Sequence, residues 1–215
     1  MHGRLITFEG MDGSGKSTQM SRTADWLHEQ GLEVVCTREP GDTPLGAEIR
    51  RLLLTSGHRP FPEAELLLFL ADRAQHVGEL VAPALAAGKW VLCDRYSDST
   101  LAYQMAGRRL DEGEVRRMLA FAELGVRPEC TLWFDLPVGV GIERMRLRQA
   151  SGEKATRLDD EAIAFHERVA EGFAALHQSE PQRLLRIDAA GSIEQVQLAV
   201  RAALSPLLPA SQASR

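Results

Sequence analysis

Residues 10–17 (GMDGSGKS) match the spacing G-x-x-x-x-G-K-[ST], which surrounds the phosphates of a nucleotide when it joins a strand to a helix. Glycines at these positions let successive backbone N–H groups turn toward one phosphate, and the helix N-terminus adds partial positive charge. Lys16 would reach the β- and γ-phosphates, and Ser17 would hold Mg²⁺. The predicted nucleotide-binding residues are Gly10, Met11, Asp12, Gly13, Ser14, Gly15, Lys16, Ser17 and Thr18.

A second group of reactive side chains, Asp94-Arg95-Tyr96, follows the apolar run 90–93 (WVLC). If that run is a strand of the same parallel sheet, the Asp94 carboxylate and the Arg95 guanidinium lie at the phosphate-binding edge. The alternative is that Asp94 caps a turn and Arg95 lies on the surface.

Two helical faces carry groups suited to a planar base. Phe69 and Arg73 are spaced i, i+4, and Thr100, Tyr103 and Gln104 are spaced i, i+3, i+4. An aromatic ring beside hydrogen-bonding groups is what a planar base requires. The alternative for Phe69 is a place in the core, because it lies in the apolar run LLLFL.

Arginines dominate the basic residues. Of 25 such residues only three are lysines, which leaves 22 arginines, the side chain that binds phosphate through two parallel hydrogen bonds. Arg144, Arg146 and Arg148 occur at every second position, Arg157 follows, and residues 152–156 (GEKAT) predict a mobile flap. The alternative is an ordinary solvated helix face.

Five apolar runs alternate with helical patterns and predict the elements that position these groups. The runs are 4–9, 33–37, 90–93, 131–134 and 184–187, and the longest helical patterns are 16–30, 62–87, 97–107 and 111–124. This alternation predicts an α/β fold, a five-stranded parallel sheet with helices on both faces that binds ligands at its carboxyl edge. We expect one domain over residues 1–205, with a lid at about 144–157, and a flexible tail over 206–215.

Composition narrows the functional class. The chain has 215 residues, 44% hydrophobic and 26% charged, as is typical of a globular domain. Its net charge of −5 argues against a nucleic-acid partner. We find no leader and no membrane-spanning apolar stretch, and Cys36, Cys93 and Cys130 are predicted in or beside buried strands, which together indicate the reducing cytoplasm.

Other chemistries lack their motifs. There is no Asn-Lys-x-Asp segment to read guanine, and no cysteine has a companion at a redox or metal-binding spacing. His166-Glu167 begins a zinc-site pattern, but Ala170 stands where its second histidine would be. We expect Mg²⁺ as the cofactor, with ATP as phosphoryl donor.

Over residues 4–205 the sequence resembles the thymidylate kinase family. The resemblance rests on FEGMDGSGKST (8–18), TREPG (37–41), LLLFLADRAQH (66–76), DRYSDSTLAYQ (94–104) and the arginines of 144–157. It implies the P-loop nucleoside monophosphate kinase fold and a dTMP kinase, which transfers the γ-phosphoryl of ATP to dTMP and so gives dTDP for dTTP synthesis. It also implies a homodimer built on long apolar helices.

The resemblance assigns the dTMP site residue by residue. Phe69 would stack on thymine and Arg73 would donate to its O4, an acceptor where cytosine presents a donor. Thr100 and Gln104 would approach the base edge, and Tyr103 would pack near the ribose C2′. The remaining members of the implied dTMP site, which surround the sugar and the phosphate, are Asp12, Glu39, Arg50, Arg95 and Ser99, with Arg38 nearby.

The resemblance also assigns catalytic roles. Transition-state charge would be neutralised by Lys16, Arg95 and the lid arginines, Arg148 first and then Arg144 and Arg146. Relatives of another branch place a basic residue at the position of Gly13. Asp94 would hold Mg²⁺ through water, beside Ser17. The dTMP phosphate is already mostly dianionic at neutral pH, so in-line attack needs no general base.

The sequence departs from the family at one position of the phosphate channel. The family usually reads TREPGG, whereas here Asp42 replaces the second glycine. This substitution bears on the fine geometry of the loop and leaves the phosphate ligands intact.

Two other functions stay open at the level of sequence. A deoxynucleoside kinase would need a carboxylate base for its hydroxyl acceptor, and Glu9 or Asp94 could supply it. An ATPase or nucleotide switch would use the phosphate-binding loop without an acceptor and would leave the predicted base-reading face without a purpose.

Overall fold

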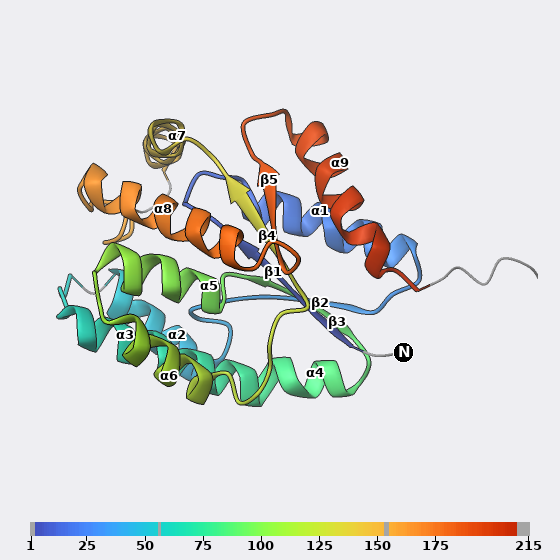
Figure 1. Ribbon diagram of the computed structural model, residues 1–215, viewed down its shortest axis with the longest axis horizontal. Helices are drawn as coiled ribbons and strands as arrows, with labels where there is room; N and C mark the ends of the chain where they lie inside the picture. The colour runs from blue at the N-terminus through green and yellow to red at the C-terminus, as the bar shows by residue number, and fades with distance from the viewer. Residues whose placement is uncertain (1–2, 56, 153–154, 210–215) are drawn as a thin grey trace, which may run out of the picture.

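The computed structural model describes residues 3–55, 57–152 and 155–209. Within them, five parallel strands form one sheet of order β2-β3-β1-β4-β5 (Figure 1). The strands are β1 (Arg4–Glu9), β2 (Val34–Arg38), β3 (Trp90–Asp94), β4 (Cys130–Asp135) and β5 (Leu184–Asp188). The predicted α/β fold is confirmed, and every predicted strand is present within one residue at each end.

Central strands owe their form to continuous apolar runs. Every residue of β1 except Arg4, and every residue of β4 except Asp135, is buried, as expected for strands covered by helices on both faces. β2 lies at an edge and is only partly covered. The prediction that all three cysteines lie in buried surroundings is therefore wrong for Cys36, which is exposed on β2.

Helices cover both faces of the sheet (Figure 1). On one face, α1 (Lys16–Glu29) and α9 (Ile193–Leu204) pack against each other and bury side chains such as Leu27 and Val200 over Phe8 and Phe134. The helices of the other face and of the sheet ends are α2 (Pro44–Arg50), α3 (Pro62–His76), α4 (Ala82–Ala86), α5 (Ser97–Thr100), α6 (Glu112–Ala122), α7 (Val138–Ala150) and α8 (Ile163–Ser179).

The long helical patterns contain π-helical turns, which are wider than α-helical ones. π-helical segments at Arg51–Thr55, Val77–Val81 and Leu101–Gly107 continue α2, α3 and α5. The sequence predicted 62–87 and 97–107 as single helices, and the apolar spacing that predicts a helix does not distinguish an α-turn from a π-turn. One consequence is that Tyr103 and Gln104 lie on a π-helical segment rather than an α-helix.

Two predicted segments reach residues outside the described ranges. Three arginines of the expected lid, Arg144, Arg146 and Arg148, lie in the second half of α7, and Arg157 follows that helix. Residues 153 and 154 of the flap lie outside the described residues. The expected tail begins with the end of a 3-10 helix, Ser205–Leu207, and Leu207 and Leu208 pack against the core. Its last residues, 210–215, lie outside the described ranges. No helix of the described residues is both long and apolar enough to cross a bilayer.

Parallel register brings the reactive residues to one edge of the sheet. Phe8 on β1 and Arg38 on β2 are both aligned with Asp94 on β3, and the phosphate-binding loop follows β1 directly. The carboxyl ends of three adjacent strands therefore meet beside the N-terminus of α1.

Candidate active site

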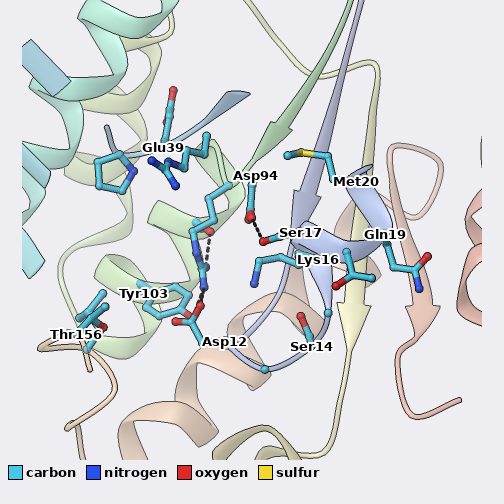
Figure 2. Close-up of a pocket in the computed structure, with 18 of the residues that line it drawn as sticks. Asp12, Ser14, Lys16, Ser17, Gln19, Met20, Glu39, Asp94, Tyr103 and Thr156 are labelled. Carbon is cyan, nitrogen blue, oxygen red and sulfur yellow. Dashed lines mark hydrogen bonds and ion pairs between the residues drawn. The ribbon is translucent and has the colours of Figure 1, made fainter. Parts of the chain in front are cut away.

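A cleft of about 890 Å³ lies along this edge (Figure 2). The predicted residues that line it are Asp12, Gly13, Ser14, Gly15, Lys16, Ser17, Thr18, Glu39, Arg50, Phe69, Arg73, Asp94, Arg95, Ser99, Thr100, Tyr103, Gln104, Arg144 and Arg148. Gly10 and Met11 lie beneath the loop and present backbone carbonyls, and Arg146 points away from the cleft into solvent. The structure thus brings together nearly all of the predicted site.

The phosphate-binding loop depends on glycine where it touches α7. Gly13 has φ of 84°, in the left-handed region that side chains rarely adopt. A Cβ at this position would lie 2.6 Å from the carbonyl oxygen of Gly141 on α7. Because the loop packs this closely against the helix that carries the arginines, position 13 has no room for a basic side chain.

Lys16 points into the centre of the loop. Its Nζ donates to the carbonyl oxygens of Gly10 at 3.1 Å and Met11 at 2.9 Å, and the side chain is buried. Burial lowers the pKa of Lys16, and the nearby positive charge of Arg95 lowers it further, while acidic neighbours oppose both effects. Lys16 and Arg95 therefore concentrate positive charge at this point of the cleft, which favours a bound anion.

Ser17 and Asp94 form a pair of hard oxygen donors beside the lysine (Figure 2). The Ser17 hydroxyl donates to Oδ2 of Asp94 at 2.8 Å. A hydroxyl and a carboxylate at a nucleotide phosphate site are the ligand types that Mg²⁺ takes, so these two residues fit that ion.

Arg95 is held at the middle of the cleft from several sides. Its φ of 73° is in the left-handed region, and its backbone N–H donates to the carbonyl of Phe8 at 3.0 Å. Nη2 donates to Oδ1 of Asp12 at 2.9 Å and to the Tyr103 hydroxyl at 3.2 Å, and Nη1 donates to Ser99 Oγ at 3.0 Å. The strained backbone and three side-chain partners fix the guanidinium plane before any ligand arrives.

Asp12 stays ionised beside this arginine. Burial alone would raise the pKa of its carboxyl, but Arg95 and Lys16 hold the pKa well below its usual range. The guanidinium also lies over the Tyr103 ring, 4.9 Å from its centroid. Asp12, Arg95 and Tyr103 therefore form one connected unit in the wall of the cleft.

Arg73 defines the far side of the cleft. Its Nε and Nη2 both donate to Oε2 of Glu39 at 2.8 Å, and Nη1 donates to Thr100 Oγ1 at 2.8 Å. Its guanidinium is buried and lies over the Tyr96 ring, 5.0 Å from its centroid. Because Phe69, one turn earlier on α3, is half-buried at the same wall, the predicted pairing of a ring with a donor is present in space.

Gln104 is oriented by a buried carboxylate. Its Nε2 donates to Oε1 of Glu65 at 2.9 Å, and Glu65 also accepts from Arg108 and Arg157. Arg157, at the end of the expected lid, therefore points to α3 rather than to the phosphate-binding loop. These two arginines lie 43 and 92 residues after Glu65 in the chain, so the sequence of α3 alone does not predict the ion pairs.

The arginines of α7 divide into two groups. Arg144 Nη1 lies 3.4 Å from the carbonyl oxygen of Gly13 and 3.3 Å from that of Ala189, and Arg148 lines the cleft one turn further along α7. Arg146, between them, faces solvent because residues two apart on a helix lie on different faces. The structure thus places two of the three predicted arginines beside the loop.

Sequence reasoning missed the wall beyond the phosphate-binding loop. Gln19 and Met20 of α1, with Ala189, Gly191, Ile193 and Val196 after β5, line this end of the cleft. The sequence signal that could have found this wall is Asp188, which marks the end of the fifth strand at the same edge of the sheet.

Arg50 was predicted, and its Nη1 donates to the carbonyl of Pro40 at 2.7 Å.

Glu9 is unavailable as a base for a hydroxyl acceptor. It accepts from the Tyr96 backbone N–H at 2.7 Å and from Ser99 Oγ at 2.5 Å, is fully buried, and does not line the cleft. Burial, together with the nearby Asp98, raises the pKa of Glu9 to about 8. The alternative in which Glu9 activates a nucleoside hydroxyl has no support in this geometry.

A phosphate-binding loop, a lysine at its centre and a second wall suited to a base define a P-loop phosphotransferase of the nucleoside monophosphate kinase fold. The comparisons then specify the family. The Thymidylate kinase family model matches residues 8–200. This chain belongs to the thymidylate kinase family.

Individual relatives agree over nearly the whole chain. Thymidylate kinase of Synechococcus sp. (strain JA-2-3B'a(2-13)) is 47% identical over 212 residues, covering 98% of each protein. The one from Geobacter sulfurreducens is 45% identical over 210 residues, covering 96% of this chain and 99% of its own. A crystal structure of thymidylate kinase from Ehrlichia chaffeensis superposes with a TM-score of 0.77 at 32% identity, covering 95% of this chain and 99% of that one.

Proposed function

We propose that the two halves of the cleft separate the substrates of this enzyme, ATP over the phosphate-binding loop and dTMP between α3 and the Leu101–Gly107 segment. The enzyme transfers the γ-phosphoryl group of ATP to dTMP and gives dTDP and ADP. The observation that carries the division is the unit of Asp12, Arg95 and Tyr103, which stands between Lys16 and Arg73.

In this account Arg73 selects the base. With Nε and Nη2 held by Glu39, Arg73 can present Nη1 to the thymine O4, while Phe69 stacks on the ring and Thr100 and Gln104 face its edge. Cytosine presents an amino donor where thymine presents O4, and a buried arginine cannot accept a hydrogen bond from it. dCMP is therefore rejected.

The sugar and phosphate of dTMP bind in the middle of the cleft. Tyr103 closes the space beside the ribose. Its buried side chain, held by Arg95, leaves little room for a 2′-hydroxyl. Arg95 and Arg50 supply positive charge for the dTMP phosphate, with Asp12, Glu39 and Ser99 fixing their surroundings. This arrangement aims a dTMP phosphate oxygen at the loop side of the cleft.

Catalysis then depends on position and charge. The acceptor is an anion at neutral pH, so no residue has to remove a proton. Lys16, Arg95, Arg148 and Arg144 surround the transferring group and neutralise its developing charge, and Arg146 joins them only if α7 rotates as residues 144–157 close over the cleft. Ser17 and Asp94 would hold Mg²⁺, which would offset the negative charge of the phosphates.

Several properties of the whole chain belong to the same proposal. Residues 1–205 act as one domain, with the cytoplasm, where ATP is supplied and thiols stay reduced, as the site of action. A homodimer forms through α3 and α6, which pack side by side and expose Leu67 and Phe121, the latter 82% accessible. Apolar side chains this exposed mark a contact surface.

ADP release measured with dTMP, with thymidine and with no acceptor tests the reaction. The proposal predicts ADP release that requires dTMP. ADP release that is equally fast without acceptor would indicate an ATPase, and a preference for thymidine would indicate a nucleoside kinase.

A further inference from the structure

Asp42, which replaces the second glycine of the family's TREPGG pattern, folds back onto the end of β2. Its Oδ2 accepts from the Arg38 backbone N–H at 3.0 Å and from Thr37 Oγ1 at 3.1 Å. Its Oδ1 lies 3.0 Å from Nε of Arg38. Asp42 is partly exposed and pairs with the Arg38 guanidinium.

Thr37 connects Asp42 to the buried His76 through its hydroxyl group. Its Oγ1 lies 2.7 Å from Nε2 of His76, and both side chains are buried. A hydroxyl has one proton to donate, and a carboxylate can only accept. When Thr37 donates its proton to Asp42, the hydrogen between Thr37 and His76 comes from Nε2 of His76.

The other ring nitrogen of His76 then needs a second proton. Nδ1 lies 2.8 Å from Oε1 of Glu39, whose Oε2 accepts from Arg73. The side chains of His76, Glu39 and Arg73 are at most 3% exposed, so water does not replace these contacts. One proton must lie between Nδ1 and Oε1 in addition to the proton on Nε2.

The charged groups around His76 are Glu39 from the β2–α2 loop and Asp72 and Arg73 from its own helix. Asp72 Oδ1 accepts from the Gly41 backbone N–H at 3.0 Å, while its buried Oδ2 has no hydrogen-bond partner among the residues that the structure describes. Burial, together with Glu39, raises the pKa of Asp72 to about 7. The Thr37–His76 hydrogen bond can also run in the opposite direction, with Thr37 donating to Nε2. Glycine at position 42 would allow this, because Thr37 would then have no carboxylate to donate to.

We propose that Asp42 is a positioning residue for the dTMP site, which sets the direction of the hydrogen bonds Thr37–His76–Glu39 and so places one additional proton on the His76–Glu39 pair. The added positive charge offsets part of the Glu39 carboxylate. More of the Arg73 guanidinium charge is then left for the base carbonyl. This inference rests on the proposed assignment of Glu39 and Arg73 to the dTMP site.

Nitrogen-15 NMR of the histidine-labelled full-length enzyme at one neutral pH tests the direction of the Thr37–His76 hydrogen bond. The His76 signals are assigned by their loss in H76Q. We expect Nε2 to carry a proton in the wild type and in T37S, and to lack one in D42G and in T37V. Thr37→Ser and Thr37→Val form a matched pair, since only the first keeps the hydroxyl.

Kinetics of the same variants give the functional readout. We expect D42G and T37V to raise the KM for dTMP about threefold to tenfold, with the KM for ATP and kcat within about twofold of wild type, because the lost interaction concerns one substrate. An Nε2 without a proton in the wild type, or unchanged in D42G, would overturn the inference. Absence of dTMP phosphorylation by the wild type would instead overturn the proposed function, which the NMR result does not depend on.

Discussion

Arg95 is the residue on which the two halves of the cleft depend. We expect Arg95→Ala to lower kcat by about 10²–10³, since it removes a preorganised positive charge from the transferring group. Steady-state kinetics with dTMP checks this, with circular dichroism to confirm the fold because Asp12 loses its partner. Arg116→Ala is the matched control, as Arg116 is exposed on α6 and pairs there with Glu112. Near-normal turnover of R95A would remove Arg95 from the mechanism.

Glu9 makes stability depend on pH in an unusual direction. Its pKa in the folded state is about 8, above the usual value of 4.5, so between these values the folded chain retains a proton that the unfolded chain loses. The contribution of Glu9 to stability is therefore lost as pH rises through that window. In thermal scans, we expect the Tm of wild type to fall relative to that of Glu9→Gln as the pH is raised from 5 to 8. A Tm difference that is constant with pH would show that Glu9 ionises normally.

At the scale of elements, Glu65 joins three separate parts of the chain. It lies on α3, holds Gln104, and pairs with Arg108 and with Arg157 of the segment after α7. We expect Glu65→Gln to destabilise the fold by about 3 kcal/mol, because two arginines lose a buried counter-charge. Chemical denaturation measures this, and Glu63→Gln, at an exposed position two residues earlier, should change little. Equal stability of the two variants would contradict this role of Glu65.

Local patterns predicted the elements far better than the contacts between them. Strands such as β1 and β4 are readable because covered parallel strands are apolar throughout, and the residues that follow them must meet at one edge. The predicted spacing of Phe69 and Arg73 likewise survives because both lie within α3. The position of Arg157 was not readable, since its partner Glu65 is 92 residues away. The outward position of Arg146 was not predicted, because residues two apart on a helix lie on different faces.

At the scale of the whole molecule, the exposed apolar side chains of α3 and α6 set the expected assembly. We expect Phe121→Glu to convert a dimer into a monomer, since it places a charge in the proposed contact surface. Light scattering at several concentrations measures the mass. Leu198→Glu, at a comparably exposed position of α9 on the opposite face of the sheet, should leave the mass unchanged. A dimer that persists in F121E would place the contact elsewhere.

The central claim is that the cleft reads thymine through Arg73. Its most direct test is the kcat/KM of the wild-type enzyme for dTMP, dUMP and dCMP as acceptors with ATP and Mg²⁺. We expect dTMP to be preferred, dUMP to rank second because it keeps O4 and lacks only the methyl group, and dCMP to fall about 10² or more below dTMP because its amino group meets a buried donor. A kcat/KM for dCMP close to that for dTMP would contradict the base-reading role of Arg73.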